Sequence, residues 1–136
     1  MKFLFLFLAL LLPLHAKDTV EGEWLKSDGT ARIKLWLNNE NQLQGVITWV
    51  QDKKRTHDTN NPDPKLRKRR LRGLKFLTGF KKEGDQFTGG KVYDSKSGKT
   101  YSGKIWAEGN DKLTMRAYKG ISILGKSAEW TRFKKK

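Results

Sequence analysis

The sequence has 136 residues, no cysteine and a formal net charge of +15, with 29 basic and 14 acidic side chains. Without cysteine no disulfide can form, so a hydrophobic core alone must hold the fold together. The length suits one domain, and the charge favours anionic partners such as membrane surfaces or glycans, unless it reflects a general basic bias of the proteome.

The first sixteen residues have the pattern of a secretory signal peptide. Lys2 is positive, an apolar run extends from Phe3 to Leu14, and Ala16 supplies a small residue for cleavage. The run is too short to span a bilayer, although an uncleaved membrane anchor is the alternative. We therefore expect residues 1–16 to be removed, residues 17–136 to form one domain, and the protein to be periplasmic or secreted.

The remaining chain alternates apolar and polar residues with a period of two, which is typical of half-buried β-strands. Turn-forming residues such as Asp28-Gly29 and Gly109-Asn110 separate the alternating runs. The short connections favour antiparallel, up-and-down order. After a first strand at Gly22-Glu23-Trp24, the pattern predicts further strands within residues 33–37, 43–49, 74–80, 87–93, 101–107, 113–117 and 128–133. We expect an all-β, eight-stranded antiparallel barrel.

The two ends of the mature chain carry residues that suit barrel closure. Trp24 lies on the first predicted strand, and Arg132 follows Trp130 and Thr131 on the last one. The first and last strands of a closed barrel are neighbours, so the guanidinium can lie over the indole ring as a cation–π contact. We therefore predict that Gly22, Trp24 and Arg132 seal the narrow end of a lipocalin-type barrel.

The connection from Gln51 to Leu71 is too long for a hairpin turn. Pro62 and Pro64 cannot pair in a central strand. Asp63 and Pro64 suit the N-cap and first position of a short helix, after which Leu66 and Leu71 would pack over one end of the barrel. We expect a lid loop that contains at most a short helix.

Several motifs cover nearly all of the mature chain, and Asn61-Pro62-Asp63-Pro64 is the most specific. The others are Gly22-x-Trp24, Leu43-x-Gly45-x-Ile47, Leu66-Arg67, Leu71-x-Gly73, Gly90, Tyr93-Asp94, Ser97-Gly98-Lys99-Thr100-Tyr101, Leu113-x-Met115-Arg116, Gly120, Leu124-Gly125 and Trp130-Thr131-Arg132. They resemble a family of secreted bacterial proteins that is catalogued only as a domain of unknown function. The resemblance implies a lipocalin-like (calycin) barrel of unassigned activity. This chain departs from the family at Ser95, where Pro is frequent.

The sequence offers few tools for catalysis, and we expect no enzymatic activity and no cofactor. His57 is the only histidine after the leader, which is too few ligands for a common zinc site. Asp58, Asp63 and Asp94 could form paired carboxylates, and Asp58, Asn60 and Asp63 could hold a cation. Such residues in turns more often cap the backbone, so we expect no metal.

A ligand cavity inside the barrel is favoured over a solid core. Inward positions at Gly45, Gly89 and Gly103 would leave volume unfilled, and the five tryptophans exceed what a core of this size needs. An apolar cavity suits one small hydrophobic ligand. The predicted lining residues are Ile33, Leu35, Leu43, Ile47, Trp49, Leu74, Phe76, Phe80, Ile105, Leu113 and Met115.

A basic run from Lys65 to Arg72 suggests an anion site. Arg67, Arg69 and Arg70 could hold a carboxylate or phosphate headgroup at the barrel mouth, and Arg116 is a further candidate if a bulge changes its face. No aromatic residue lies within the run to stack on bases, so the pattern argues against nucleic-acid binding.

Two functions follow from these patterns. The first is a carrier of an elongated, fatty-acid-like molecule, and the alternative is a basic module that binds anionic envelope or host polymers through a solid barrel.

Overall fold

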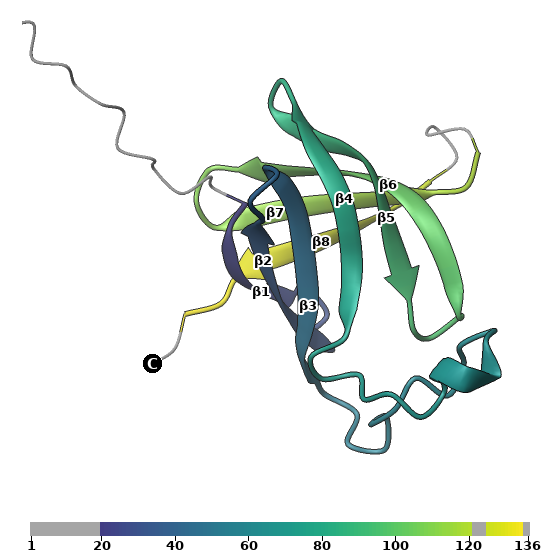
Figure 1. Ribbon diagram of the computed structural model, residues 1–136. Helices are drawn as coiled ribbons and strands as arrows, with labels where there is room; N and C mark the ends of the chain where they lie inside the picture. The colour runs from purple at the N-terminus through teal and green to yellow at the C-terminus, as the bar shows by residue number, and fades with distance from the viewer. Residues whose placement is uncertain (1–19, 121–124, 135–136) are drawn as a thin grey trace, which may run out of the picture.

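The computed structural model describes residues 20–120 and 125–134, and the predicted signal peptide lies outside them. The described chain forms a closed barrel of eight antiparallel strands in up-and-down order, with β8 pairing onto β1 (Figure 1). The predicted fold class is therefore confirmed. The strands are β1 (Gly22–Lys26), β2 (Ala31–Leu37), β3 (Gln42–Val50), β4 (Lys75–Glu83), β5 (Gln86–Asp94), β6 (Lys99–Glu108), β7 (Lys112–Tyr118) and β8 (Lys126–Arg132).

Local chemistry explains where the strands begin and end. In the β1–β2 turn, the Asp28 carboxylate accepts hydrogen bonds from the backbone N–H and the hydroxyl of Thr30, at 3.0 and 2.6 Å. Gly29 follows with a φ of 75°, which residues with a Cβ rarely adopt. Within β3, Leu43, Gly45 and Ile47 are buried and their neighbours are half-buried, as a strand with one face on the core requires.

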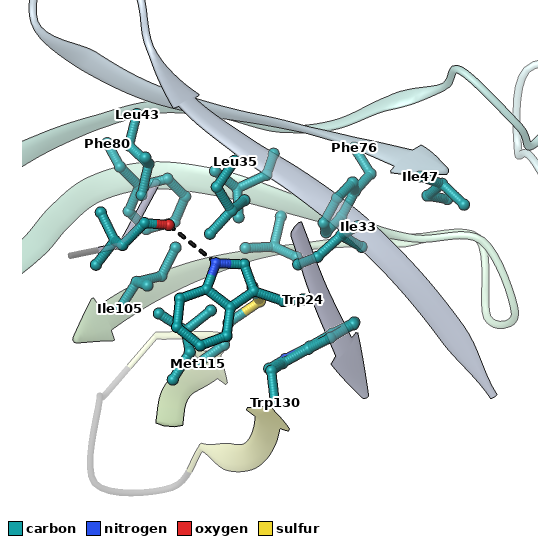
Figure 2. Packing of buried hydrophobic residues seen from close by; sticks show 14 of the residues in the cluster. Trp24, Ile33, Leu35, Leu43, Ile47, Phe76, Phe80, Ile105, Met115 and Trp130 are labelled. Carbon is teal, nitrogen blue, oxygen red and sulfur yellow. Dashed lines mark hydrogen bonds between the residues drawn. The ribbon is translucent and has the colours of Figure 1, made fainter. Parts of the chain in front are cut away.

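One half of the barrel interior is a packed apolar core. Trp24, Leu43, Phe80, Ile105 and Leu113 are fully buried. Trp24 lies in the middle of the cluster, and its indole N–H donates to the carbonyl of Val20 at 3.0 Å (Figure 2). This end of the barrel is closed by side chains.

The inward-facing glycines make room for this core and not for a ligand. A Cβ at Gly45 would lie 2.6 Å from the side chain of Leu35, and one at Gly103 would lie 3.1 Å from the Phe80 ring. Gly89 was expected to face inward, but it is exposed, and the next residue, Gly90, is buried against Phe80 instead. The expectation that these glycines leave volume empty is wrong.

The long connection between β3 and β4 lies beside one end of the barrel (Figure 1). It holds a 3-10 helix, η1 (Pro64–Leu66), with Pro64 in its first turn and the Asp63 carboxylate accepting from the Lys65 N–H at 3.0 Å. This is the short capped helix that the sequence predicts. Leu71 is buried, but Leu66 is exposed, so only one of the two leucines packs as expected. Within the described ranges, no helical segment has the length and apolarity to cross a bilayer.

Candidate functional site

The half of the barrel away from the packed core encloses a cavity of about 750 Å³ that is open at one end. Its wall is built from the β1–β2 hairpin, the end of β3, the start of β4, the β5–β6 hairpin and the facing ends of β7 and β8. Ligand pockets commonly measure roughly 300–1,000 Å³. The apolar side chains on the wall include those of Ala31, Ile33, Ile47, Val50, Phe76, Val92, Met115, Ala117, Ala128 and Trp130.

The predicted lining residues divide between the cavity and the packed core. Ile33, Ile47, Phe76 and Met115 line the cavity. Six others are buried but do not reach it: Leu35, Leu43, Leu74, Phe80, Ile105 and Leu113. Figure 2 shows the reason, since Ile33, Ile47 and Phe76 lie on one side of Trp24. Leu43, Phe80 and Ile105 lie on its other side, so Trp24 stands between the hollow and filled halves.

The assignment of Trp49 to the cavity is wrong, because a β-bulge reverses the end of β3. Ile33 pairs with Ile47, but the preceding residue, Arg32, pairs with Trp49, which leaves Thr48 as an extra residue. Trp49 therefore shares the outer face with Arg32, whose guanidinium carbon is 4.8 Å from the indole centroid. Val50 takes the inward position in its place and lines the cavity.

Sequence reasoning also missed Val92 and Trp130 as lining residues. Val92 was missed because the register shift between Thr88 and Lys91 changes which residues of β5 face inward. Trp130 enters the sequence analysis only as part of the Trp130-Thr131-Arg132 motif, yet its buried side chain forms part of the cavity wall. Trp130 and Ala128 are two residues apart on β8, so they face the same side of the sheet, and Ala128 also lines the cavity. This alternation was the signal in the sequence that could have identified Trp130.

The four arginines predicted to hold a headgroup do not line the cavity. Arg69 forms an ion pair with Asp58, and Arg67 donates from Nε to the carbonyl of Asn61 at 2.8 Å. Arg70 is exposed in a short bridge to His57. The Arg116 side chain lies on the outer face of β7, where it donates to the Ser127 hydroxyl at 3.3 Å. No bulge turns Arg116 inward, and within the basic run Arg67 and Arg69 hold the loop that contains them.

Other charged residues surround the mouth of the cavity, and most of them lie on hairpins. They are Lys26, Asp28, Arg55, Asp94, Lys96, Lys119, Lys126 and Glu129. Five of these eight side chains are cationic, so the mouth has an excess of positive charge above an apolar interior.

Asp58 joins the long loop to the barrel wall and is fully buried. Its carboxylate accepts hydrogen bonds from the Tyr93 hydroxyl at 2.6 Å, the Asn61 amide at 2.8 Å and Arg69 Nε at 2.9 Å. The Arg69 guanidinium also lies over the Tyr93 ring, 5.6 Å from its centroid. The loop is thus held in a defined position against β5.

The carboxylates considered for catalysis or cation binding have structural partners instead. Asp58 has the contacts described above, and Asp63 caps η1. Asp94 accepts from the Lys96 N–H and the Ser97 hydroxyl at 3.0 and 2.9 Å, which shapes the β5–β6 hairpin. Among residues 20–120 and 125–134, no three His, Cys, Asp or Glu side chains gather as a metal site would need.

Hydrogen bonds fix the protonation states of the Asp58 cluster. Burial raises the pKa of Asp58, but the hydrogen bonds from Tyr93, Asn61 and Arg69 outweigh it, so the net pKa lies below the usual value. Burial and the hydrogen bond to Asp58 raise the pKa of Tyr93 to about 12. Near neutral pH the carboxylate is charged and the phenol is protonated, as the hydrogen bonds require.

The Asp58 cluster is expected to make stability depend on acid pH. Because the folded-state pKa is lowered, its contribution is present above the unfolded-state pKa of about 3.9 and is lost as the pH falls through the folded-state value. Asp58→Asn should lower the free energy of unfolding by about 1–3 kcal/mol near neutral pH. Urea unfolding should show this difference shrinking below about pH 4, with Asp63→Asn, which keeps a capping side chain, as the control. If Asp58→Asn lowers the free energy of unfolding equally near neutral pH and below about pH 4, the cluster does not have this role.

At the closed end, β1 and β8 meet as the barrel requires. Trp24 pairs with Arg132 in the register, and the guanidinium carbon lies 4.2 Å from the centroid of the indole ring. Arg132 also donates to the carbonyl of Glu21 at 2.8 Å and to that of Asn110. A Cβ at Gly22 would lie 2.7 Å from Arg132 Nη1, and the φ of 120° there disfavours other residues.

A second, smaller hollow of about 330 Å³ lies between the long loop and the outer face of β4, β5 and β6. Phe76 and Tyr93 line both the cavity and this second hollow, so their two rings separate the one from the other. Strand pairing between β4 and β5 reaches Leu77 and Val92 and does not continue to Phe76 and Tyr93. The rings fill the space where the two strands part.

A family model described as "Uncharacterized protein conserved in bacteria (DUF2147)" matches residues 22–132. No curated protein matches the chain. Among solved structures, the chain is similar to a protein from the human pathogen Helicobacter pylori that is described as belonging to the lipocalin family. The two are 24% identical, the similarity covers 88% of this chain and 85% of that one, and the TM-score is 0.75. This similarity supports the barrel fold.

Proposed function

This chain belongs to the family of uncharacterised bacterial proteins DUF2147, and we propose that it is an exported carrier that holds one small, elongated hydrophobic molecule in its barrel. The observation that carries this proposal is the cavity of about 750 Å³, which is closed at one end by the Trp24 core and open at the other. A barrel of eight strands has an interior that side chains can fill or that can hold one small ligand. Here half of the interior is left for a ligand.

The chemistry of the wall supports an apolar ligand. Ile33, Ile47, Val92 and Met115 contribute aliphatic surface, and Phe76 and Trp130 contribute aromatic surface. Burying apolar area is favourable by about 25 cal/mol per Å². An elongated molecule, such as one with a fatty-acid-like chain, suits a cavity whose lining extends from hairpin residues such as Lys26 and Ser95 to interior residues such as Ile33.

Two further parts of the proposal rest on the sequence. Export is proposed because Met1 to Ala16 have the signal-peptide pattern. A non-enzymatic role is proposed because the sole histidine of the mature chain, His57, is not on the cavity wall, and the nearby carboxylates are engaged in turns and loop contacts. Binding and release require none of these groups to react.

Titration with a neutral hydrophobic fluorophore, N-phenylnaphthylamine, tests the carrier function. Its emission should rise on entering the apolar cavity and saturate at one molecule per chain, and a long-chain fatty acid should displace it. Weak binding that does not saturate, with no displacement, would contradict the proposal. In that case, binding of anionic polymers through the exposed cations of Lys65, Lys68 and Arg72 would be better supported than the carrier function.

A further inference from the structure

We propose that the rim of the cavity is a carboxylate-binding site centred on Arg55, which makes the carrier select acidic amphiphiles over neutral molecules of the same length. This inference rests on the proposed carrier function and adds to it a ligand class and the residues that choose it. The site differs from the basic run of the long loop, whose arginines do not reach the cavity.

Positive charge exceeds negative charge at the rim. Two of its three carboxylates lie beside cations, since Asp28 is 3.7 Å from Lys26 and Glu129 is 3.4 Å from Lys112. Asp94 accepts hydrogen bonds from neutral groups of its own hairpin and keeps its charge, so the rim has five cations against three carboxylates. The remaining rim cations form no ion pair among the described residues, and they are Arg55, Lys96, Lys119 and Lys126. The rim therefore has positive charge that its own carboxylates do not neutralise.

Arg55 is held in place at the rim. Its Nη2 donates to the Ser95 hydroxyl at 3.0 Å, and both residues line the cavity. Its backbone N–H donates to the Asp52 carbonyl at 3.0 Å. A guanidinium has five N–H donors, and its fork matches the two oxygens of a carboxylate. A positioned, half-buried arginine loses little side-chain freedom when it binds such a group.

The loop that carries Arg55 is fixed to the β5–β6 hairpin, which also carries Ser95. The Asn60 amide donates to the Lys96 carbonyl at 2.9 Å, and Asp58 ties the loop to Tyr93 at 2.6 Å. These contacts set Arg55 beside Lys96 at the mouth, above the apolar wall formed by residues such as Ile47 and Val92. An apolar chain in the cavity would thus leave its acidic end at the rim.

Calorimetric titration with dodecanoate and dodecanol, two ligands of equal chain length, tests the inference. The protein should bind dodecanoate about tenfold more tightly than dodecanol. Arg55→Gln should remove most of this preference by weakening dodecanoate alone. Arg72→Gln makes the same charge change on an exposed residue away from the cavity and should leave both affinities unchanged. Melting temperatures of both variants should match that of the parent protein, which shows that the fold is intact.

A double variant separates the direct contact of Arg55 with the carboxylate from the general electrostatic attraction of the other rim cations. Lys96→Gln with Lys126→Gln should weaken dodecanoate by a few-fold, and about 1 M salt should abolish that effect because exposed charges are screened. Equal affinity for the two ligands in the parent protein, or equal weakening of both by Arg55→Gln, would overturn the inference and leave the carrier function standing. Binding of neither ligand would overturn both.

Discussion

Replacing Trp24 by alanine is expected to lower the free energy of unfolding by about 3–5 kcal/mol, the usual cost of removing a large buried aromatic side chain. Trp24 is fully buried, packs between the filled and hollow halves of the barrel, and anchors Val20 through its indole N–H. Chemical unfolding in urea measures the change. Trp36→Ala removes the same side chain from a half-buried position on β2 and should cost much less.

The partner of Trp24 across the barrel seam should matter less. Arg132→Ala removes the cation–π contact and the hydrogen bonds to Glu21 and Asn110, for a loss of about 1–2 kcal/mol. Arg72→Ala, an exposed arginine, is the control and should change stability by less than about 0.5 kcal/mol. If Trp24→Ala and Arg132→Ala both leave the unfolding transition unchanged, these residues do not close the barrel.

Replacing Ile47 by glutamate is expected to abolish binding of an apolar ligand. Ile47 lies on the cavity wall, and an unpaired carboxylate there would be buried by the ligand at a cost of several kcal/mol. The same change at Val46 places the charge on the outer face of β3 and serves as the matched control. Fluorophore titration should show at least about a hundredfold loss for Ile47→Glu and parent-like affinity for Val46→Glu.

Ile47 is buried, so Ile47→Glu is expected to lower the melting temperature more than Val46→Glu does. The titration is therefore made well below both melting temperatures, where circular dichroism shows that the two variants are folded. Unchanged fluorophore binding by Ile47→Glu would mean that the fluorophore binds elsewhere, and the cavity would lose its place in the function.

Much of the fold could be predicted because period-two alternation and turn residues specify strands locally. The runs around Ile33, Leu43 and Leu113 gave the right faces for this reason. The alternation fails where a strand carries an extra residue. Thr48 and Gly89 are such points, and they move Trp49 outward and Gly90 inward. A bulge depends on the pairing of two strands, which the pattern of one strand does not contain.

The candidate site could be predicted only in part, because it depends on contacts between distant segments. Inward parity identified Ile33, Ile47, Phe76 and Met115, but it could not say which half of the barrel would be filled. That outcome depends on Phe80, whose ring occupies the space beside two glycines from other strands.

Charged residues were harder still to place. The density of arginines between Lys65 and Arg72 pointed to an anion site, whereas the structure uses Arg69 to neutralise buried Asp58 from the same loop. Arg55 stands alone in the sequence and gains its position at the rim only through Ser95, forty residues later in the chain.

As a carrier, the barrel would hold a small molecule in its cavity. Native mass spectrometry of the protein purified from its exported form, before and after extraction with organic solvent, tests this most directly. The carrier function predicts a complex with one small molecule per chain that extraction removes and that added fatty acid restores. An identical mass before and after extraction, with no uptake of added fatty acid, would contradict it.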